Sequence, residues 1–386
     1  AWSQKIPGEA WSAPIVWKNR VFVTSFITDE KLTDPKTGYY APFKTKKPKG
    51  ICQWMVVCLD LTTGKIIWER VAHKGKAQHT IHVKGSYASE TPVTDGEHVY
   101  AYFGNVGLYC YDMQGNKKWS KSWPVVKTQL GWGTGSSPVI HKDRIYILND
   151  NTTKSHFTAL NKKTGEKVWT VERQEKGSWA TPFIWENDKR TEIITCAPKR
   201  TRSYSLDGKV LWELGRMSTL CIPTPVVSNG WLIINSGYEF GGFRPVYAIR
   251  PGASGDITLK RGEKSSKFVA WHQPRAGCYH PTTLAYGDYI YILYSRGYLG
   301  CFDAKTGKEV YEKQKLEGSF TASPWAADGK IYCLSESGDV YVVQAGPKFK
   351  VLARNSMGEI SLATPAIAGD RFLIRTRSKL YCIRKQ

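Results

Sequence analysis

The sequence predicts an all-β fold, an eight-bladed β-propeller with four antiparallel strands in each blade. Three observations lead to this prediction: a signal of a small residue before Pro recurs along the chain, a second signal ending in Trp alternates with it, and the two termini resemble two parts of one blade. We expect one domain over residues 1–386, because a repeat array can form a single domain of any length.

The first signal is a small residue and Pro, followed by an apolar run, a polar turn and a second apolar run. It occurs eight times at a mean spacing of about 48 residues, a period typical of propellers and solenoids. The copies are Ser12-Ala13-Pro14, Glu90-Thr91-Pro92, Ser136-Ser137-Pro138, Ala180-Thr181-Pro182, Pro223-Thr224-Pro225, the weaker His280-Pro281-Thr282, Ala322-Ser323-Pro324 and Ala363-Thr364-Pro365.

The second signal is clearest from Cys58 to Trp68, where a strand, a Thr-Gly-Lys turn and a Trp-bearing strand follow one another. Gly supplies the positive φ of such hairpin turns, and the alternating apolar residues on both sides are strand signals. Related copies end at Trp119, Trp169, Trp212, Trp271 and Tyr311. We expect each Trp to wedge between adjacent blades over a turn. The recurring Cys58, Cys110, Cys301 and Cys382 share a position with Ala159, which predicts buried core thiols.

The chain ends predict how the ring closes. The last unit, from Ala363 to Gln386, contains three strand patterns, the third of which is Leu380–Ile383. Residues 1–10 begin with a segment that resembles the fourth strand of other units, so we expect it to complete the last blade and remove two exposed sheet edges.

The net charge of +22 predicts attraction to anionic partners such as acidic polysaccharide, nucleic acid or an anionic membrane surface. The alternative is a solvated lysine-rich surface. No apolar run is long enough to span a membrane, and no signal peptide is visible. Nine cysteines without a Cys-x-x-Cys motif give no support for a zinc knuckle or an attached haem.

The Ala/Cys-x-Asp-x-x-Thr-Gly-Lys-x-x-Trp pattern resembles the tryptophan-docking repeat of pyrroloquinoline-quinone-like (PQQ-like) propellers, over nearly the whole chain. Segments 87–96, 131–138 and 178–182 are similar to uncharacterised PQQ-like repeat proteins of planctomycete type. Two other branches are the quinoprotein dehydrogenases and a propeller lipoprotein of outer-membrane β-barrel assembly, which is a docking scaffold. The resemblance implies a periplasmic or secreted protein.

Loops on one face of the predicted ring surround the central channel and supply the candidate site. Inter-blade loops lead from one blade into the next, and intra-blade loops join the second and third strands of a blade. The expected ligand-binding residues on these loops are Trp132, Trp179, Lys199, Arg200, Arg202, Tyr238, Arg244, Arg275, Arg296, Arg375 and Arg377, with Lys84 and Tyr279 beside them. Guanidinium groups fit carboxylate, sulfate or phosphate, and the intra-blade loops contain few carboxylates apart from Glu239 and Glu336. We expect an anion-binding face with aromatic platforms.

Several functions stay open at this point. The favoured one is a scaffold that binds an anionic ligand, preferably acidic polysaccharide, or a protein partner. The alternative is a polysaccharide lyase, whose chemistry needs a cation for the substrate carboxylate and a His or Tyr to move a proton. Its candidate catalytic residues are His79, His82, Tyr87 and His280, assisted by Arg202 and Tyr238. Nucleic-acid binding rests on charge alone.

A PQQ-dependent dehydrogenase is the remaining function. It requires Ca²⁺ held by carboxylate and amide ligands, and the expected face is nearly free of carboxylates. We therefore expect no cofactor, PQQ with Ca²⁺ being the exception to test. No metal site is expected either, because His79 and His82 lie in a predicted loop rather than on a helix.

The longest insertion is expected over residues 24–53, between two strands of the first blade. It is strongly basic through Lys31, Lys36, Lys44, Lys46, Lys47 and Lys49, with Tyr39, Tyr40 and Phe43 interleaved. Loops of this length in compact domains often carry function or move. A lid, a partner-docking arm and a disordered flap are equally compatible with its composition.

Overall fold

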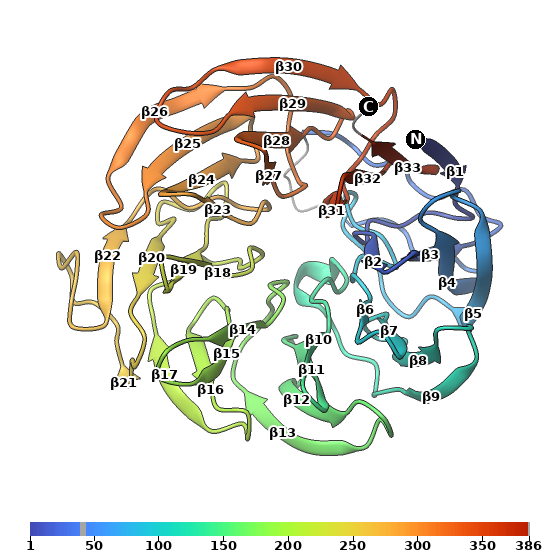
Figure 1. Ribbon diagram of the computed structural model, residues 1–386. Helices are drawn as coiled ribbons and strands as arrows, with labels where there is room; N and C mark the ends of the chain where they lie inside the picture. The colour runs from blue at the N-terminus through green and yellow to red at the C-terminus, as the bar shows by residue number, and fades with distance from the viewer. Residues whose placement is uncertain (39–43, 385–386) are drawn as a thin grey trace.

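The computed structural model describes residues 1–38 and 44–384. Within these residues the chain forms eight β-sheets arranged as blades around one ring, and the rainbow of Figure 1 passes once around it. The eight-bladed propeller that the sequence predicts is therefore confirmed. Within the same ranges no helix is long and apolar enough to cross a bilayer.

The strands follow one another blade by blade. Blade 1 contains β2 (Ile15–Trp17), β3 (Arg20–Ile27), β4 (Ile51–Asp60) and β5 (Ile66–Lys76), and blade 2 contains β6 (Val93–Thr94), β7 (His98–Tyr102), β8 (Leu108–Asp112) and β9 (Lys117–Lys121). Blade 3 contains β10 (Val139–His141), β11 (Arg144–Asn149), β12 (Ser155–Asn161) and β13 (Lys167–Arg173), and blade 4 contains β14 (Phe183–Glu186), β15 (Thr191–Thr195), β16 (Thr201–Tyr204) and β17 (Val210–Leu214). Blade 5 contains β18 (Val226–Ser228), β19 (Trp231–Asn235), β20 (Val246–Ile249) and β22 (Val269–Gln273), and blade 6 contains β23 (Leu284–Tyr286), β24 (Tyr289–Tyr294), β25 (Tyr298–Asp303) and β26 (Glu309–Lys315). Blade 7 contains β27 (Trp325–Ala327), β28 (Lys330–Leu334), β29 (Asp339–Gln344) and β30 (Val351–Ser356), and blade 8 contains β31 (Ala366–Ala368), β32 (Arg371–Arg375), β33 (Lys379–Arg384) and β1 (Trp2–Lys5).

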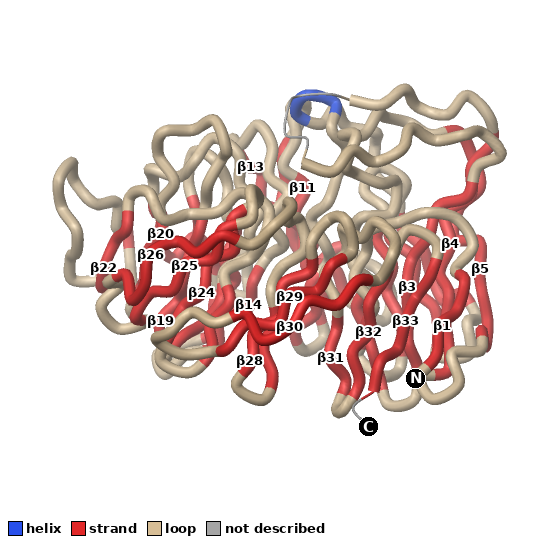
Figure 2. The backbone as a smooth tube through the Cα atoms, turned by 90° about the horizontal axis from the view of Figure 1, so that it is seen from above, coloured by secondary structure: helices blue, strands red, loops and turns tan. Residues whose placement is uncertain are grey.

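Two further elements lie in connections between strands. The strand β21 (Gly255–Asp256) belongs to the segment between β20 and β22 of blade 5, yet it pairs in parallel with β17 of blade 4. The 3₁₀ helix η1 (Gln129–Gly131) lies in the inter-blade loop between blades 2 and 3, and Figure 2 shows it among the loops on one face of the ring.

The ring closes as the termini predict. β1 pairs antiparallel with β33, with Trp2 opposite Cys382 and Lys5 opposite Lys379. The Ile6 N–H also donates to the Ser378 carbonyl at 3.0 Å. The N- and C-termini consequently lie at the same blade in Figure 1. The paired strand covers Trp2–Lys5 of the expected 1–10 segment.

Five tryptophans on fourth strands dock onto the following blade, as expected. The Trp2 indole N–H donates to the Leu61 carbonyl at 2.9 Å, and the Trp68 N–H donates to the Met113 carbonyl at 3.0 Å. Trp119, Trp169 and Trp271 repeat the contact with the next turn. A methyl group at Gly64 would lie 2.5 Å from the Trp2 ring, so only glycine leaves room for the indole there.

The strand register explains the repeated cysteines. Cys58 lies opposite Trp68, Cys110 opposite Trp119 and Cys382 opposite Trp2, so a small side chain faces each docked indole. In blades 1 to 7, the pairing register of the third and fourth strands shifts directly after the residue pair at the fourth-strand Trp position. All nine cysteines are buried and unpaired, and burial raises the pKa of Cys58 to about 12. These thiols are core residues, as expected.

Three junctions depart from the docking pattern. Blade 6 has Tyr311 at the Trp position, opposite Cys301, and its hydroxyl has no hydrogen-bond partner within the described residues. Trp212 donates its indole N–H to Glu192 of its own blade at 2.7 Å, where β21 lies against β17. Blade 7 has Ala353 at the Trp position, opposite Val342. Blade 8 offers no turn for docking, because its third and fourth strands come from opposite ends of the chain.

Aromatic packing replaces the missing dock between blades 7 and 8. The Trp325 ring stacks on Tyr332 with centroids 5.5 Å apart, and Tyr332 lies 4.9 Å from Phe372 of blade 8. The three rings belong to one cluster of buried side chains across this junction.

The basic insertion is shorter than the sequence suggests. Residues 24–27 belong to β3 and residues 51–53 to β4, so the connection covers residues 28–50. The boundary was misplaced because both strands are unusually long and the polar residues Thr24, Ser25 and Gln53 interrupt their apolar runs. Tyr39, Tyr40 and Phe43 lie outside the described residues. The flanking parts reach other blades: Asp34 forms an ion pair with Arg377 at 2.8 Å, and the Gly38 N–H donates to Glu336 at 2.8 Å.

Replacing Trp271 with Ala should lower the free energy of unfolding by about 3–5 kcal/mol, because the buried indole leaves a cavity between two blades. Trp271→Phe keeps a ring but loses the hydrogen bond to Ala304, and should cost about 1 kcal/mol. Urea denaturation followed by intrinsic fluorescence measures both values.

The exposed Leu352 on β30 provides the control, and Leu352→Ala should change stability by less than about 0.5 kcal/mol. A Trp271→Ala protein as stable as this control would contradict the docking role of the tryptophan.

Candidate functional site

The main candidate site is a cavity of about 290 Å³ at one mouth of the central channel. Its walls come from inter-blade loops of most blades. We call it the channel cavity; its lining residues are Trp11, Ala13, His82, Lys84, Gly85, Ser89, Thr91, Trp132, Thr134, Gly135, Ser137, Trp179, Thr181, Ile222, Tyr279, His280, Thr321, Ser323, Leu362 and Thr364. No aspartate or glutamate is in this set.

Two tryptophans form one wall of the channel cavity. Trp132 follows η1, and its backbone carbonyl accepts the His82 N–H at 3.1 Å, which ties the loops of adjacent blades together. The Trp179 indole N–H donates to the Gly133 carbonyl at 3.0 Å. The two rings lie 5.8 Å apart, and both belong to an apolar cluster with Tyr279 and Tyr238. Backbone hydrogen bonds between loops therefore hold the aromatic wall in place.

Lys84 is the cation of the cavity lining. Its Nζ lies 2.5 Å from Glu336 Oε1, and both side chains are almost completely buried. Glu336 also accepts the Thr321 hydroxyl at 2.7 Å and the Gly38 N–H at 2.8 Å. Burial lowers the pKa of Lys84, and the negative charge of Glu336 opposes this shift.

Two histidines and Tyr279 adjoin Lys84. His82 Nδ1 accepts the Lys84 backbone N–H at 3.2 Å, so the neutral ring carries its proton on Nε2. The His280 ring lies 3.9 Å from the Tyr279 ring, and its Nδ1 is 3.1 Å from the Ser295 hydroxyl. Burial lowers the pKa of His280 well below its usual value, and the charge of Lys84 acts in the same direction. His280 is therefore neutral at physiological pH.

The residues before the repeated prolines, with Thr282 as their equivalent in blade 6, form a hydrogen-bonded series around the channel. In six blade-to-blade steps the backbone N–H donates to the side-chain hydroxyl of the equivalent residue in the next blade. These bonds join Ala13 to Thr91 (3.1 Å), Thr91 to Ser137 (2.9 Å), Ser137 to Thr181 (3.1 Å), Thr224 to Thr282 (3.2 Å), Thr282 to Ser323 (3.0 Å) and Ser323 to Thr364 (3.0 Å). From the sequence we predicted only a small residue at this position. The recurrence of Ser or Thr there was a signal that we missed.

Glu90 lies directly before one of these residues and is buried. Its Oε1 has no hydrogen-bond partner within the described part of the chain. Burial raises the pKa of Glu90 to about 7, against a hydrogen bond with Thr134 that lowers it. This carboxyl group therefore changes its charge near neutral pH, beside the channel cavity.

The four candidate catalytic residues separate into two pairs. His82 and His280 both line the channel cavity. His79 and Tyr87 do not: the Tyr87 hydroxyl donates to the His79 carbonyl at 3.0 Å, and Tyr87 packs on Phe26 with centroids 4.6 Å apart. Burial lowers the pKa of His79 to about 4. Alternation along a loop gives no indication of which side chain turns inward, so the sequence could not separate the pairs.

Of the expected ligand-binding residues, only Trp132 and Trp179 line the channel cavity. Four arginines have carboxylate partners from other parts of the chain. Arg200 pairs with Asp256 at 2.8 Å, Arg202 with Glu175 at 2.6 Å, Arg296 with Glu239 at 3.0 Å and Arg377 with Glu9 at 2.8 Å. Tyr238 packs on Tyr279 behind the wall, Arg244 is half-buried, and Lys199 and Arg275 are exposed. The positive potential of this face is smaller than its arginines alone suggest.

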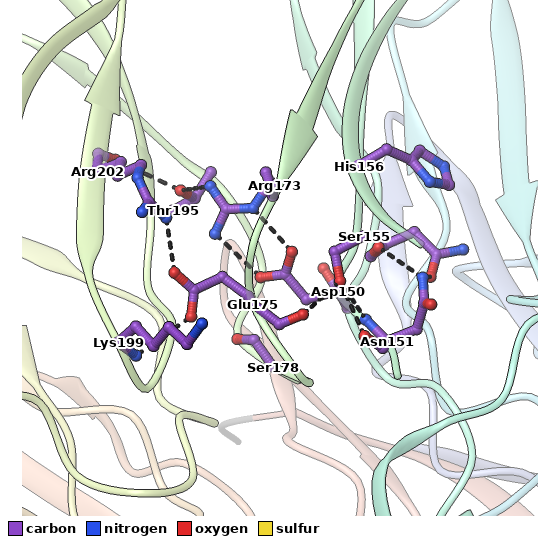
Figure 3. A network of polar contacts seen from close by, with 12 residues as sticks. Asp150, Asn151, Ser155, His156, Arg173, Glu175, Ser178, Thr195, Lys199 and Arg202 are labelled. Atoms are coloured by element: carbon purple, nitrogen blue, oxygen red, sulfur yellow. Dashed lines mark hydrogen bonds and ion pairs between the residues drawn. The ribbon is translucent and has the colours of Figure 1, made fainter. Parts of the chain in front are cut away.

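Arg202 lies on strand β16, not on the expected loop, and takes part in a buried network between blades 3 and 4. Figure 3 shows Arg202 facing Glu175 while Arg173 faces Asp150. Arg173 forms a two-pronged ion pair with Asp150 at 2.7 and 3.0 Å, and Arg202 also pairs with Glu213 at 2.5 Å. Such satisfied pairs hold the two blades in register.

Arg375 also differs from the expectation, because it lies on strand β32 and is only 1% exposed. Its Nη1 donates to the Thr24 carbonyl at 2.6 Å and to the Ser12 hydroxyl at 3.0 Å. Burial lowers the pKa of Arg375 to about 9. Its guanidinium bridges blade 8 to blade 1 rather than facing the channel mouth.

The lining residues do not fit PQQ with Ca²⁺. Ca²⁺ takes six to eight oxygen ligands, carboxylates prominent among them, and the lining of the channel cavity has none. Across residues 1–38 and 44–384, no group of three or more His, Cys, Asp or Glu side chains is arranged to hold a metal ion.

Comparison with known proteins places the chain among propellers of this architecture. A family profile described as outer membrane protein assembly factor BamB matches residues 53–219, 123–349 and 205–386. No curated protein sequence matches.

Three solved structures share the fold. BamB from Moraxella catarrhalis is 13% identical, with 99% of this chain and 97% of that chain covered and a TM-score of 0.58. A computationally designed protein, Ika8, is 12% identical, with 98% of each chain covered and a TM-score of 0.60. Quinohemoprotein alcohol dehydrogenase from Comamonas testosteroni is 14% identical, with 99% and 75% covered and a TM-score of 0.54.

The contribution of Glu90 to the free energy of unfolding should fall as the pH rises from about 4 to about 7, because folded Glu90 binds its proton more tightly than the unfolded chain does. The contribution is fully present below the unfolded pKa and is lost as the pH passes through the folded value. The expected loss is on the order of 3 kcal/mol. Glu90→Gln should remove this contribution from the profile and be more stable than the parent protein at about pH 8.

Denaturant titrations across this pH range measure the profile. The exposed Glu312 is the matched control, and Glu312→Gln should leave the profile unchanged. A Glu90→Gln profile that parallels that of the parent protein would show that Glu90 does not titrate as stated.

Proposed function

The chain belongs to the PQQ-like repeat family described as outer membrane protein assembly factor BamB, and from this membership we propose that it is a binding scaffold that recognises an anionic ligand at its channel cavity. The family description names an assembly factor, a role that depends on binding. The channel cavity is a recessed surface on the axis of the ring, and this is the surface to which we assign the ligand.

The observation that carries the proposal is the charge composition of the cavity lining. Lys84, His82 and His280 line it, and no carboxylate does. The carboxylate of Glu336 stands behind Lys84 and is held by Thr321 and Gly38 as well. A ligand anion therefore meets ammonium, imidazole and hydroxyl groups, and charge-assisted hydrogen bonds to such groups are the stronger kind.

The net charge of the chain supports the same ligand class. A charge of +22 favours encounter with anions over the whole surface. The four paired arginines reduce this attraction locally, because their charges are compensated by carboxylates. The name of the family points to the outer membrane, and we propose a periplasmic or secreted location for this chain on that basis.

Isothermal titration calorimetry with polygalacturonate and with poly-L-glutamate should detect binding of an anionic polymer that weakens as salt is raised. The double variant Lys84→Met/Glu336→Gln removes both members of the buried pair, so that neither charge is left uncompensated. It should reduce the affinity by about tenfold or more, since one ion-assisted contact is worth about 1.5–3 kcal/mol.

Lys305 lies in an exposed turn on the opposite face, and Lys305→Met makes the control because it removes the same charge far from the cavity. If the two variants weaken binding equally, the anion is attracted by net charge alone and the channel cavity is not its site.

One observation favours a second function, a uronate lyase. His82 and His280 converge with Lys84 and Tyr279 in one cavity. In such a reaction a base removes the proton next to the substrate carboxylate, the bond to the neighbouring glycosidic oxygen breaks, a carbon–carbon double bond forms, and the leaving oxygen takes a proton. The ultraviolet absorbance of the unsaturated product measures this. We expect none with polygalacturonate; absorbance that His280→Gln abolishes would instead establish the enzyme.

A further inference from the structure

We propose that the channel cavity selects a saccharide ring that carries a carboxylate, through hydroxyl donors on the channel axis and aromatic side chains around them. The inference rests on the proposed function and narrows its ligand from anions in general to sugar acids. Two features of the lining carry it, and neither contributes to the charge argument.

The first feature is the hydrogen bonding of the Ser and Thr hydroxyls that line the cavity. A hydroxyl has one proton to donate and two lone pairs to accept with. Thr91, Ser137, Thr181, Ser323 and Thr364 line the cavity, and each accepts a backbone N–H from the preceding blade. Within the described ranges, no protein acceptor takes the hydroxyl proton of any of the five. Several O–H donors from different blades thus surround the same space.

These donors require a partner that is rich in oxygen. A carboxylate offers about four acceptor sites on two oxygens, and sugar hydroxyl and ring oxygens offer more around it. An apolar ligand would leave the hydroxyls without acceptors, at the cost of unmade hydrogen bonds. The hydroxyl series therefore selects against apolar ligands and favours ones with many oxygens.

The second feature is the aromatic lining. Trp11, Trp132, Trp179 and Tyr279 reach the cavity, and Trp132 and Trp179 lie 5.8 Å apart. The faces of these rings carry partial negative charge, and the C–H groups on the face of a pyranose carry partial positive charge. A sugar ring satisfies both features at once, because it has a C–H face for the aromatic side chains and oxygens for the hydroxyls.

The volume of the cavity separates sugar acids from acidic polypeptides. About 290 Å³ is at the lower end of the range for small-molecule sites. One or two sugar rings fill such a space and contact its walls. A glutamate side chain brings a carboxylate but has no ring to cover the tryptophans. An acidic peptide can therefore accept hydrogen bonds from the hydroxyls, but it leaves the aromatic side chains uncovered.

The test compares trigalacturonate, its neutral counterpart galactotriose, and triglutamate by isothermal titration calorimetry. Trigalacturonate should bind at least about tenfold more tightly than either of the others, which corresponds to about 1.4 kcal/mol. Saturation-transfer difference NMR, with irradiation of the aromatic protons, should transfer signal to the ring protons of trigalacturonate.

A matched pair of variants isolates the channel hydroxyl. Thr181 and Thr282 belong to the same hydrogen-bond series and accept equivalent backbone bonds, but only Thr181 lines the cavity. Thr181→Val and Thr282→Val should lower stability to a similar extent, while only Thr181→Val should weaken trigalacturonate binding, by about five- to tenfold. Thr181→Ser should restore the affinity because it keeps the hydroxyl.

The outcomes separate this inference from the proposed function. Tight binding of triglutamate or poly-L-glutamate without trigalacturonate binding would overturn the saccharide inference and leave the anion-binding scaffold standing. Equal losses of affinity in Thr181→Val and Thr282→Val would also overturn it. The absence of binding to every anionic probe would overturn both.

Discussion

The contact between a fourth-strand tryptophan and the turn of the next blade is the interaction on which the ring depends. Each docked indole buries its ring over a glycine and donates its N–H to a backbone carbonyl, as Trp2 does at Leu61 and Trp271 at Ala304. The contact joins blades that share no strand pairing, and it fixes how far one blade is rotated from the next. A cysteine or alanine opposite the indole leaves room for it. The geometry of the channel follows from this repeated spacing.

Ring closure changes this rule at one junction for a topological reason. Because β33 and β1 come from opposite ends of the chain, blade 8 has no turn on which a tryptophan of blade 7 could dock. Ala353 stands at that position in blade 7, and Trp325, Tyr332 and Phe372 join the two blades by stacking instead. On the other side, the Trp2 dock and the Arg371 bond to the Leu61 carbonyl join blade 8 to blade 1. Blade 8 therefore packs against both of its neighbours, blade 7 and blade 1, through different contacts.

The same regular spacing produces the channel cavity. Seven of the eight first strands begin directly after a Pro, and in most blades the residue before the first strand's Pro, or its equivalent Thr282 in blade 6, is hydrogen-bonded to the equivalent residue of the next blade. The backbone N–H groups form hydrogen bonds between blades, while the hydroxyl groups that accept them can still donate their protons to a ligand in the channel. Charge is distributed by a different principle. Arg202 and Arg377 meet carboxylates of other segments, whereas the cavity lining contains no carboxylate. The electrostatic character of the site therefore depends on a few buried groups, Lys84 and Glu336 above all.

The sequence by itself determined the number of blades, five of the docking positions and the closing strand, because turn glycines, strand alternation and the Trp spacing are local properties that repeat. It also indicated His82, His280, Trp132 and Trp179, since these residues lie on loops whose position in the repeat is known. Only the tertiary structure decided that His79 and Tyr87 point away from the channel cavity and that Arg375 is buried between blades. It likewise brought Glu175 to Arg202 and Glu336 to Lys84. The two members of each pair come from segments of different blades, and the distance between these segments depends on how the blades pack around the ring, which no local pattern encodes.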